Sequence, residues 1–202
     1  GTIVGTSGAD SLTGGNGAGT ISALAGDDTL YGYDGNDTLY GGTGTDLIYG
    51  NQADDLIYGN QGSDTLFGGQ NADTIFGGQD ADILYGNRGA DVVYGNRGND
   101  TLHGGQEADT LYGGQGDDSL AGNSGNDLLF GNLGADTFTF HFGDGNDTVS
   151  GYSAAEGDVI QFDAGTNVTS AATETGLTLT AGDVTVSLIG VAKIEDVNIL
   201  FA

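Results

Sequence analysis

The feature that most constrains this chain is a nine-residue repeat that runs through most of its 202 residues. With aspartate set as the sixth residue of each repeat, 14 of the 15 anchor positions between residues 10 and 136 are Asp, and Gly19 is the exception. Two residues after every anchor stands an apolar side chain, from Leu12 to Phe138. A fixed period kept over so many repeats is typical of a solenoid, in which each repeat packs only on its neighbours.

Each position in the repeat has a physical role. The three residues after an anchor, such as 38–40 (Thr-Leu-Tyr), alternate in polarity, which predicts a very short strand with its central side chain inward. The other six, such as 41–46, are rich in glycine, which adopts the positive φ angles that sharp turns require. A circuit of strand, turn, strand and turn therefore takes two of the nine-residue repeats.

Stacked circuits of this kind predict an all-β fold, a parallel β-roll in which two sheets face each other and each turn of the solenoid spans two repeats. Strands stack about 4.8 Å apart, so about seven circuits form a rod roughly 35 Å long. The inward apolar series gives a thin core, with one side chain per half-turn. Such a core does not offset by itself the ordering of so many glycines, so another source of stability is needed.

The aspartates indicate that source, because anchors two repeats apart lie above one another along each edge of the rod. One column holds Asp10, Asp28, Asp46, Asp64, Asp82, Asp100, Asp118 and Asp136, and the other holds Asp37, Asp55, Asp73, Asp91, Asp109 and Asp127. Carboxylates and turn carbonyls between successive circuits suit Ca²⁺, which accepts about six to eight oxygens, whereas Zn²⁺ prefers His or Cys. Seven gaps and five gaps allow up to 12 Ca²⁺ sites, and 12 × 2 gives +24 against a net charge of -26.

The composition excludes several classes of partner. A net charge of -26 disfavours nucleic acids and anionic membrane surfaces, because both repel carboxylates. The chain has no cysteine, so disulfides and thiolate metal sites are excluded. No apolar run approaches the roughly 20 residues of a membrane span, and no signal peptide is visible. The first residue is Gly1 rather than Met, which indicates processing or the loss of an upstream part.

Segments such as 113–121, Gly-Gly-Gln-Gly-Asp-Asp-Ser-Leu-Ala, match the pattern G-G-x-G-x-D-x-U-x, in which U is a large apolar residue. Over residues 5–150 the chain thus resembles the RTX (repeats-in-toxin) haemolysin-type calcium-binding nonapeptide-repeat proteins. The resemblance implies a secreted protein, extracellular or at the cell surface, that is exported unfolded by the type I secretion machinery. Extracellular calcium modules bind at about 10⁻⁴–10⁻³ M, so the medium itself is expected to trigger folding.

Departures from the repeat predict local defects. Gly19 lacks a carboxylate, so we expect the calcium site between its turn and that of Asp37 to be weak or absent. Arg88 and Arg97 occupy the third position of two successive repeats, where Gln is frequent. We expect both arginines to pair with nearby carboxylates rather than to displace an ion.

After Asp136 the register of the repeat slips. Residues 143–149 form one more repeat, delayed by two residues, and alternating segments such as 176–180 then replace the glycine-rich turns. The last circuit of a solenoid needs a cover, so we divide the chain into a calcium-binding β-roll, 5–150, and a C-terminal β capping region, 151–202. Residues 195–202 are acidic and then apolar, which is similar to a type I export signal and equally fits a plain final strand.

No catalytic site and no organic cofactor are expected. The chain has no His-Glu-x-x-His zinc motif, no Gly-x-Ser-x-Gly nucleophile and no phosphate-binding loop. His103 takes the place of an aromatic residue in its repeat, and His141 lies among phenylalanines in the expected cap. Paired carboxylates are better explained as calcium ligands than as an acid–base pair. We therefore predict that the chain is not an enzyme.

The ninth position of most repeats is aromatic, so each outer face of the roll carries a row of rings. One row starts at Tyr31, and the other comprises Tyr40, Tyr58, Phe76, Tyr94, Tyr112 and Phe130. Stacked rings stabilise neighbouring strands. Flat aromatic faces also exceed the apolar patches usual for monomers, so self-association of rods through these faces is a second interpretation.

Two functions remain open at this point. In the first, the chain is a structural, self-assembling extracellular protein of a fibre or matrix. In the second, it is the C-terminal folding and secretion module of a larger RTX protease, lipase or adhesin. The lack of another domain in these residues favours the first if the chain is complete, and an upstream catalytic domain would favour the second.

Overall fold

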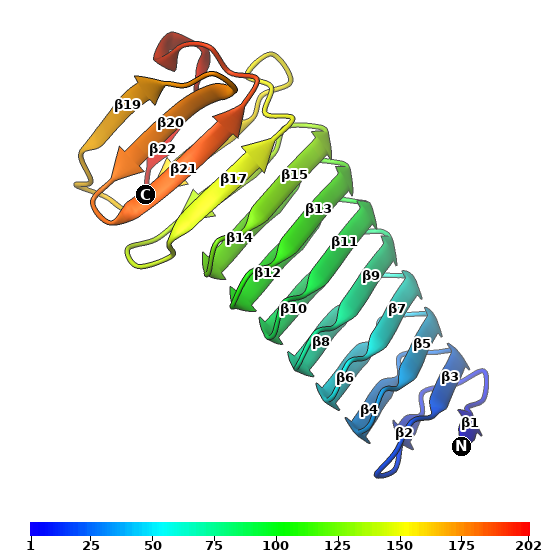
Figure 1. Ribbon diagram of the computed structural model, residues 1–202. Coiled ribbons are helices and arrows are strands. Elements are labelled where there is room, and N and C mark those ends of the chain that lie inside the picture. Colours follow the sequence, from blue (N-terminus) through cyan, green and yellow to red (C-terminus); the bar gives the residue numbers. More distant parts are fainter.

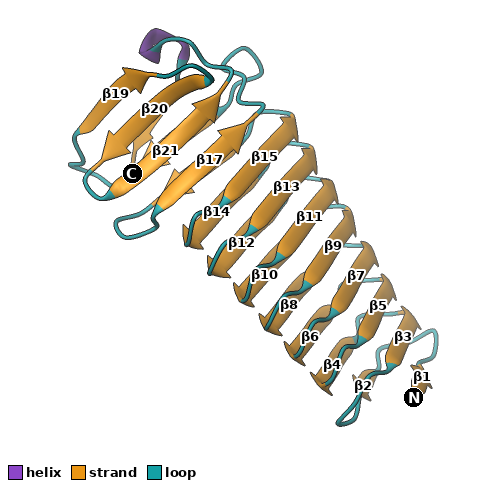
Figure 2. Ribbon diagram, viewed as in Figure 1, coloured by secondary structure: helices purple, strands orange, loops and turns teal.

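The structure is a computed structural model that describes residues 1–202, and it is a β-rod with a wider C-terminal end (Figure 1). The strands of the regular part are β1 (Thr2–Val4), β2 (Ser11–Thr13), β3 (Thr20–Ala25), β4 (Thr29–Asp34), β5 (Thr38–Thr43), β6 (Leu47–Gln52), β7 (Leu56–Gln61), β8 (Thr65–Gln70), β9 (Thr74–Gln79), β10 (Ile83–Arg88), β11 (Val92–Arg97), β12 (Thr101–Gln106), β13 (Thr110–Gln115), β14 (Ser119–Ser124), β15 (Leu128–Leu133) and β16 (Thr137–Phe140). The C-terminal strands are β17 (Asn146–Ser150), β18 (Val159–Phe162), β19 (Val168–Ala172), β20 (Gly176–Ala181), β21 (Val184–Ile189) and β22 (Ile199–Phe201). The single helix, η1, has three residues (Ile194–Asp196), and no helix here is long and apolar enough to cross a membrane (Figure 2).

Successive strands alternate between two parallel sheets, so each strand pairs with the strand one full turn away. Odd-numbered strands from β1 to β17 form one sheet, and even-numbered strands from β2 to β18 form the other. Paired residues are two repeats apart along the chain: Leu39 lies opposite Ile57, and Leu66 lies opposite Leu84. The predicted fold class, an all-β parallel roll with two repeats per turn, is therefore confirmed.

The core of the roll is the inward apolar series that the repeat predicts. One large apolar side chain per strand, from Leu30 to Leu129, is completely buried between the two sheets. Because adjacent members come from opposite sheets, they form a single layer along the axis of the rod. The core is continuous but has no second layer of side chains behind it.

The strands of the roll are longer than the predicted triplet, and most have six residues. The chain still turns within them, since Asn51 in β6 and Asn60 in β7 have φ of 83° and 81°. Identical turns lie directly above one another, so turn amides pair with the next circuit as strand amides do; the Gly44 N–H donates to the Gln61 carbonyl at 2.9 Å. Stacking thus extends the hydrogen-bond ladder into the turns, which local sequence alone does not indicate.

The C-terminal end broadens because antiparallel strands join one sheet. β21 pairs in parallel with β17, and β20 and β19 follow as an antiparallel meander. β22 joins the other sheet beside β18. Both sheets thus run on past residue 150, and the division of the chain into 5–150 and 151–202 stays a prediction.

Candidate metal centres along two aspartate columns

The anchor aspartates line the two edges of the roll, each immediately before a strand. From Asp28 to Asp136 every anchor aspartate is only 1 to 3% exposed. Asp10, in the first turn, is partly exposed. A carboxylate that leaves water needs a compensating partner, so burial of this whole series requires an explanation in terms of bonding.

One oxygen of each carboxylate has a protein partner. The backbone N–H of Asp46 donates to Oδ1 of Asp64 at 2.8 Å, and the same bond recurs in every gap of both columns at 2.7–3.0 Å. Each bond joins an anchor position to the aspartate two repeats later. The carboxylates therefore connect successive circuits through the polypeptide itself.

The second oxygen, Oδ2, has no hydrogen-bond partner in nearly the whole series. The 14 buried and unpartnered Oδ2 atoms belong to Asp28, Asp37, Asp46, Asp55, Asp64, Asp73, Asp82, Asp91, Asp100, Asp109, Asp118, Asp127, Asp136 and Asp147. An unsatisfied buried carboxylate oxygen is costly, and the cost is removed when a cation binds it. A periodic series of such atoms is the donor pattern of a column of metal centres.

Glycine at the first position of nearly every repeat keeps the space beside Oδ2 open, and Ala23 is the exception before Asp28. A Cβ atom on Gly77 would lie 2.5 Å from Oδ2 of Asp82 and 2.9 Å from the carbonyl oxygen of Gly95. The same arrangement recurs at Gly50 and Gly59. The open space is therefore bordered by a carboxylate oxygen and a carbonyl oxygen from the next turn, and only a residue without a side chain preserves it.

The donor set fits Ca²⁺ better than a transition metal. No three His, Cys, Asp or Glu side chains converge on one point, so backbone carbonyls must supply most ligands. Oxygen ligands in flexible geometry are what Ca²⁺ accepts, whereas structural Zn²⁺ sites need His or Cys. The residues present thus fit calcium.

Burial makes these carboxyls weak acids when no cation is bound. Desolvation, followed by repulsion from neighbouring columnar aspartates, raises the pKa of Asp73 and Asp109 to about 8. The same causes raise the pKa of Asp64 to about 7. Carboxyls such as those of Asp73 and Asp109 therefore resist ionisation at neutral pH when no metal is bound, whereas a bound divalent cation would favour it.

The N-terminal end of each aspartate column differs from the middle of the column. Oδ2 of Asp10 accepts hydrogen bonds from the backbone N–H and the hydroxyl of Thr6, at 2.6 and 2.9 Å. Gly19 brings no carboxylate, yet its N–H still donates to Oδ1 of Asp37 at 2.7 Å. The absence of the side chain thus leaves the stacking intact, and the weak calcium site expected there stays a prediction.

Two further aspartates continue the columns beyond the series predicted from the sequence. Oδ1 of Asp147 accepts the N–H of Asp127, and Oδ1 of Asp158 accepts that of Asp136, both at 2.9 Å. The spacings are 20 and 22 residues, so a strict count of nine misses both. The local signal, an aspartate two residues before an apolar Val149 or Ile160, is present in both cases.

The expected charge pairing of the two repeat arginines is wrong. Arg88 and Arg97 form no ion pair; the two pairs in the structure are His141–Asp163 and Lys193–Glu195. Arg88 is the last residue of β10 and lies in register between Gln70 of β8 and Gln106 of β12. The anchor carboxylates are buried inside the turns, so these side chains do not meet them.

The aromatic residues form two stacks, one on each outer face. Adjacent rings in the row from Tyr40 to Phe130 are 4.7–5.0 Å apart and within 7° of parallel. His103 ends the other row, 4.9 Å from Tyr85, so it substitutes for an aromatic ring as predicted. Burial lowers the pKa of His103. Stacked rings present mainly their edges to solvent.

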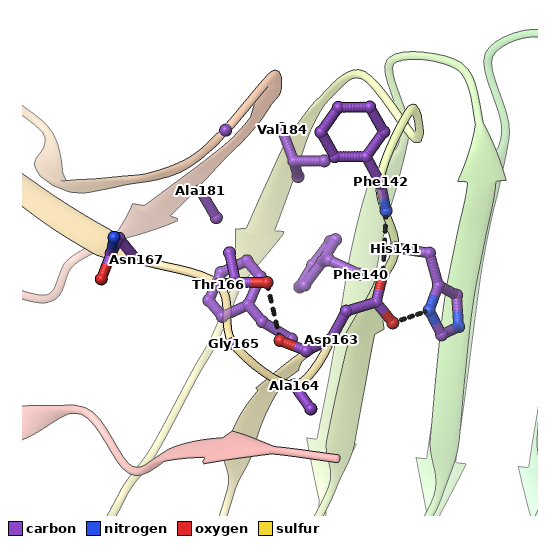
Figure 3. Close-up of a pocket in the computed structure, with 12 residues that line it drawn as sticks. Phe140, His141, Phe142, Asp163, Ala164, Gly165, Thr166, Asn167, Ala181 and Val184 are labelled. Carbon is purple, nitrogen blue, oxygen red and sulfur yellow. Dashed lines mark hydrogen bonds and ion pairs between the residues drawn. The ribbon is translucent and has the colours of Figure 1, made fainter.

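A hollow of about 460 Å³ lies where the roll meets the C-terminal strands, lined by Phe140, Phe162 and Val184 among others (Figure 3). At its rim the His141 ring lies 2.7 Å from Oδ1 of Asp163, and this bond lowers the pKa of Asp163. The Phe142 N–H donates to the other oxygen of Asp163 at 3.1 Å. The pair therefore joins the loop after β16 to the loop after β18.

Comparisons with known proteins agree with the repeat. The family model described as RTX calcium-binding nonapeptide repeat matches in overlapping segments: 2–30, 14–48, 40–75, 49–84, 67–102, 76–111 and 103–138. Among solved structures, the chain is similar to the extracellular lipase LipA from Serratia marcescens, with 20% identity and a TM-score of 0.36. That alignment covers all of this chain and 40% of the lipase chain. No curated protein matches.

Proposed function

Because the chain belongs to the RTX calcium-binding nonapeptide repeat family, we propose that it is an extracellular rod that folds when Ca²⁺ enters its two aspartate columns. Repeats of this family bind calcium and are characteristic of secreted proteins. The ligands we assign are the anchor aspartates from Asp10 to Asp136, together with turn carbonyls. When bound, calcium supplies the positive charge that the columns lack.

The observation that carries this proposal is the row of unpartnered Oδ2 atoms. All are buried, and most lie beside an open space that the first-position glycine preserves, as at Gly77 and Asp82. Without a cation the columns combine buried charge with mutual repulsion, so folding and ion binding are expected to be one event. Extracellular sites of this kind bind at about 10⁻⁴–10⁻³ M, which is favourable for a chain that folds only after export.

A calcium titration of the metal-free chain, followed by far-ultraviolet circular dichroism, tests the proposal. At neutral pH with chelator we expect little β signal, and at about 10⁻⁴–10⁻³ M Ca²⁺ a cooperative gain. Mg²⁺ should be much weaker because it keeps its waters and requires stricter octahedral geometry. A chain that is fully folded at neutral pH in chelator would overturn the proposal.

Two matched variants separate ligand loss from simple charge loss. Asp82→Asn removes a carboxylate whose Oδ2 has no partner, whereas Asp54→Asn removes an exposed carboxylate that accepts the Ala72 N–H at 3.2 Å. Each removes one negative charge. We expect Asp82→Asn to raise the calcium midpoint several-fold and Asp54→Asn to leave it nearly unchanged. Equal effects would count against the assigned ligands.

We also propose a structural role, in which rods associate through their two aromatic faces, and no catalytic role. Support comes from the unbroken stack from Tyr40 to Phe130 on one face. Light scattering in millimolar Ca²⁺ tests the proposal, and large assemblies are the expected result. Tyr94→Ser, within the stack, should weaken assembly, while Tyr33→Ser, outside the two rows, should not. A folded monomer at all concentrations would contradict the structural role.

A further inference from the structure

The two columns end differently where the roll meets the C-terminal strands. Asp147 and Asp158 are the last aspartates of their columns, and each is 2% exposed. Oδ2 of Asp158 accepts the N–H of Ser153 at 2.7 Å, so the polypeptide satisfies that carboxylate. Oδ2 of Asp147 is buried and has no partner. The two aspartates thus share their burial and their place at the end of a column, but differ in the bonding of Oδ2.

The loop that carries Asp147 keeps part of the turn geometry of the roll. Residues 143–147 read Gly-Asp-Gly-Asn-Asp, and Gly143 and Gly145 have φ of 93° and 115°. In the regular turn before Asp118, Gly114 and Gly116 have φ of 122° and 128°. Gly145 also bridges to Gly125 in the turn below. The match is confined to the second half of the loop, because Phe142 stands where most repeats carry the first-position glycine and a Cβ on Gly143 would meet no atom of the turn below.

The loop before Asp158 has none of these features. Residues 153–157 read Ser-Ala-Ala-Glu-Gly, and among them only Gly157 has a positive φ. The backbone N–H of Ser153 donates to Oδ2 of Asp158, the carboxylate oxygen that has no partner in most of the columnar aspartates. The contrast identifies the loop at residues 143–147, and not the neighbouring one, as the loop that stacks through a glycine on the turn below and leaves the Oδ2 atom of its aspartate unpartnered.

We propose that Asp147 holds one further divalent cation, at the junction between the roll and the C-terminal strands. The proposal rests on the calcium columns proposed above, and extends them past residue 138, where the family match ends. The neighbouring ligand in the column is Asp127, whose Oδ2 is also buried and unpartnered. Asp144, 6% exposed, adds a carboxylate at the third position of this repeat, where most repeats carry an uncharged residue; its Oδ2 accepts the His141 N–H at 2.6 Å, so its Oδ1 is the oxygen left for an ion.

Such an ion would fix the strand on which the meander is built. Asp147 lies in β17, and β17 pairs with β21 along its whole length. β20 and β19 are attached to the rest of this sheet only through β21. A cation that anchors β17 to the turn of Asp127 therefore makes the order of these strands depend on calcium.

The test compares Asp147→Asn with Glu156→Gln, which removes an exposed carboxylate close to the same junction. Bound calcium is measured on the full chain by equilibrium dialysis and metal analysis, and hydrogen exchange is followed by mass spectrometry. Asp147→Asn should bind one ion fewer than the unmodified chain. Amides of residues 176–189 should exchange at least about tenfold faster while the roll stays protected. Glu156→Gln should match the unmodified chain in both measurements.

An unchanged ion count in Asp147→Asn would overturn the junction site, and so would loss of protection throughout the roll. Failure of the calcium columns themselves has a different signature, because the unmodified chain would then bind no calcium. The two proposals thus fail separately.

Discussion

The roll and the C-terminal meander are both β-structure, yet they bury different chemistry. A roll strand such as β10 buries one large apolar side chain, Leu84, and is preceded by a buried carboxylate, Asp82, with an unpartnered oxygen. β20 and β21 each bury three apolar side chains, among them Leu179 and Val186, and no charge. On the proposed function an ion completes the interior of the roll, whereas the meander is completed by its own side chains.

The difference shows how a repeat limits a protein core. Nine residues allow one inward apolar side chain, because the other positions are needed for turns and for the outer face. An antiparallel strand can place every second residue inward. A solenoid with short repeats therefore gains stability from what binds between its turns, and a meander gains it from apolar burial.

The largest expected effect is the pH dependence of the metal-free roll. Desolvation raises the pKa of Asp82 from 3.8 to about 8, so between these values the folded roll holds more protons than the unfolded chain. The free energy of unfolding then falls as pH rises through this window. We expect the chain in chelator to gain β signal by circular dichroism as pH is lowered from about 8 to about 4. With calcium bound, we expect the β signal to fall as pH is lowered, because protons compete with the ion for Oδ2. Equal β signals at about pH 8 and about pH 4 in chelator would contradict the prediction that burial of these carboxyls sets the stability of the metal-free roll.

A second prediction concerns the cores. Leu84→Ala and Leu179→Ala each remove a fully buried side chain and should each lower the free energy of unfolding by about 2–5 kcal/mol. Higher calcium should offset the loss more fully in the roll, whose columns carry most of the proposed sites, than in the meander, which only the proposed junction site links to calcium. Thermal unfolding, with hydrogen exchange resolved by segment, measures both. Equal rescue of the two variants would show that one source of stability serves both regions.

A third prediction tests the space beside Oδ2. Gly77→Ala would place a methyl group against Asp82 and the Gly95 carbonyl, at a cost of about 1–3 kcal/mol and with weaker calcium binding. Gly15→Ala is the matched control, because a Cβ there meets nothing within 4 Å. Calcium titration and thermal unfolding of both variants provide the comparison. If Gly15→Ala were as harmful, the effect would come from glycine loss in general.

The smallest expected effect is that of the aromatic stacks. Tyr94 lies 4.8 Å from both Phe76 and Tyr112, so Tyr94→Ala should cost about 0.5–1.5 kcal/mol beyond the loss of buried area. Tyr33→Ala should cost less, because Tyr33 is 47% exposed and its ring stacks on one other ring, that of Tyr31, at 6.1 Å. Chemical denaturation of the calcium-loaded variants measures the difference. A larger loss at Tyr33 would contradict the view that stacking stabilises the faces.

The sequence by itself determined the roll, because its information is periodic. Once Asp46 and Asp64 are known to be two repeats apart, stacking places them in one column. The inward apolar series follows from the same count, and Ile48 and Leu66 indeed lie opposite each other in neighbouring strands. The oxygen-rich turns likewise predicted the class of metal. All of these conclusions follow from the nine-residue period and the stacking that it implies.

Only the tertiary structure decided what happens where the count fails. Asp147 and Asp158 join the columns across 20 and 22 residues, and only their three-dimensional contacts show that Ser153 satisfies one of them. The structure also shows that Oδ1 accepts a backbone N–H while Oδ2 has no partner in most of these carboxylates, and that Arg88 has no carboxylate partner. The physical reason is that a repeat fixes each residue relative to its copies, whereas hydrogen bonds and ion pairs depend on atoms that no period relates.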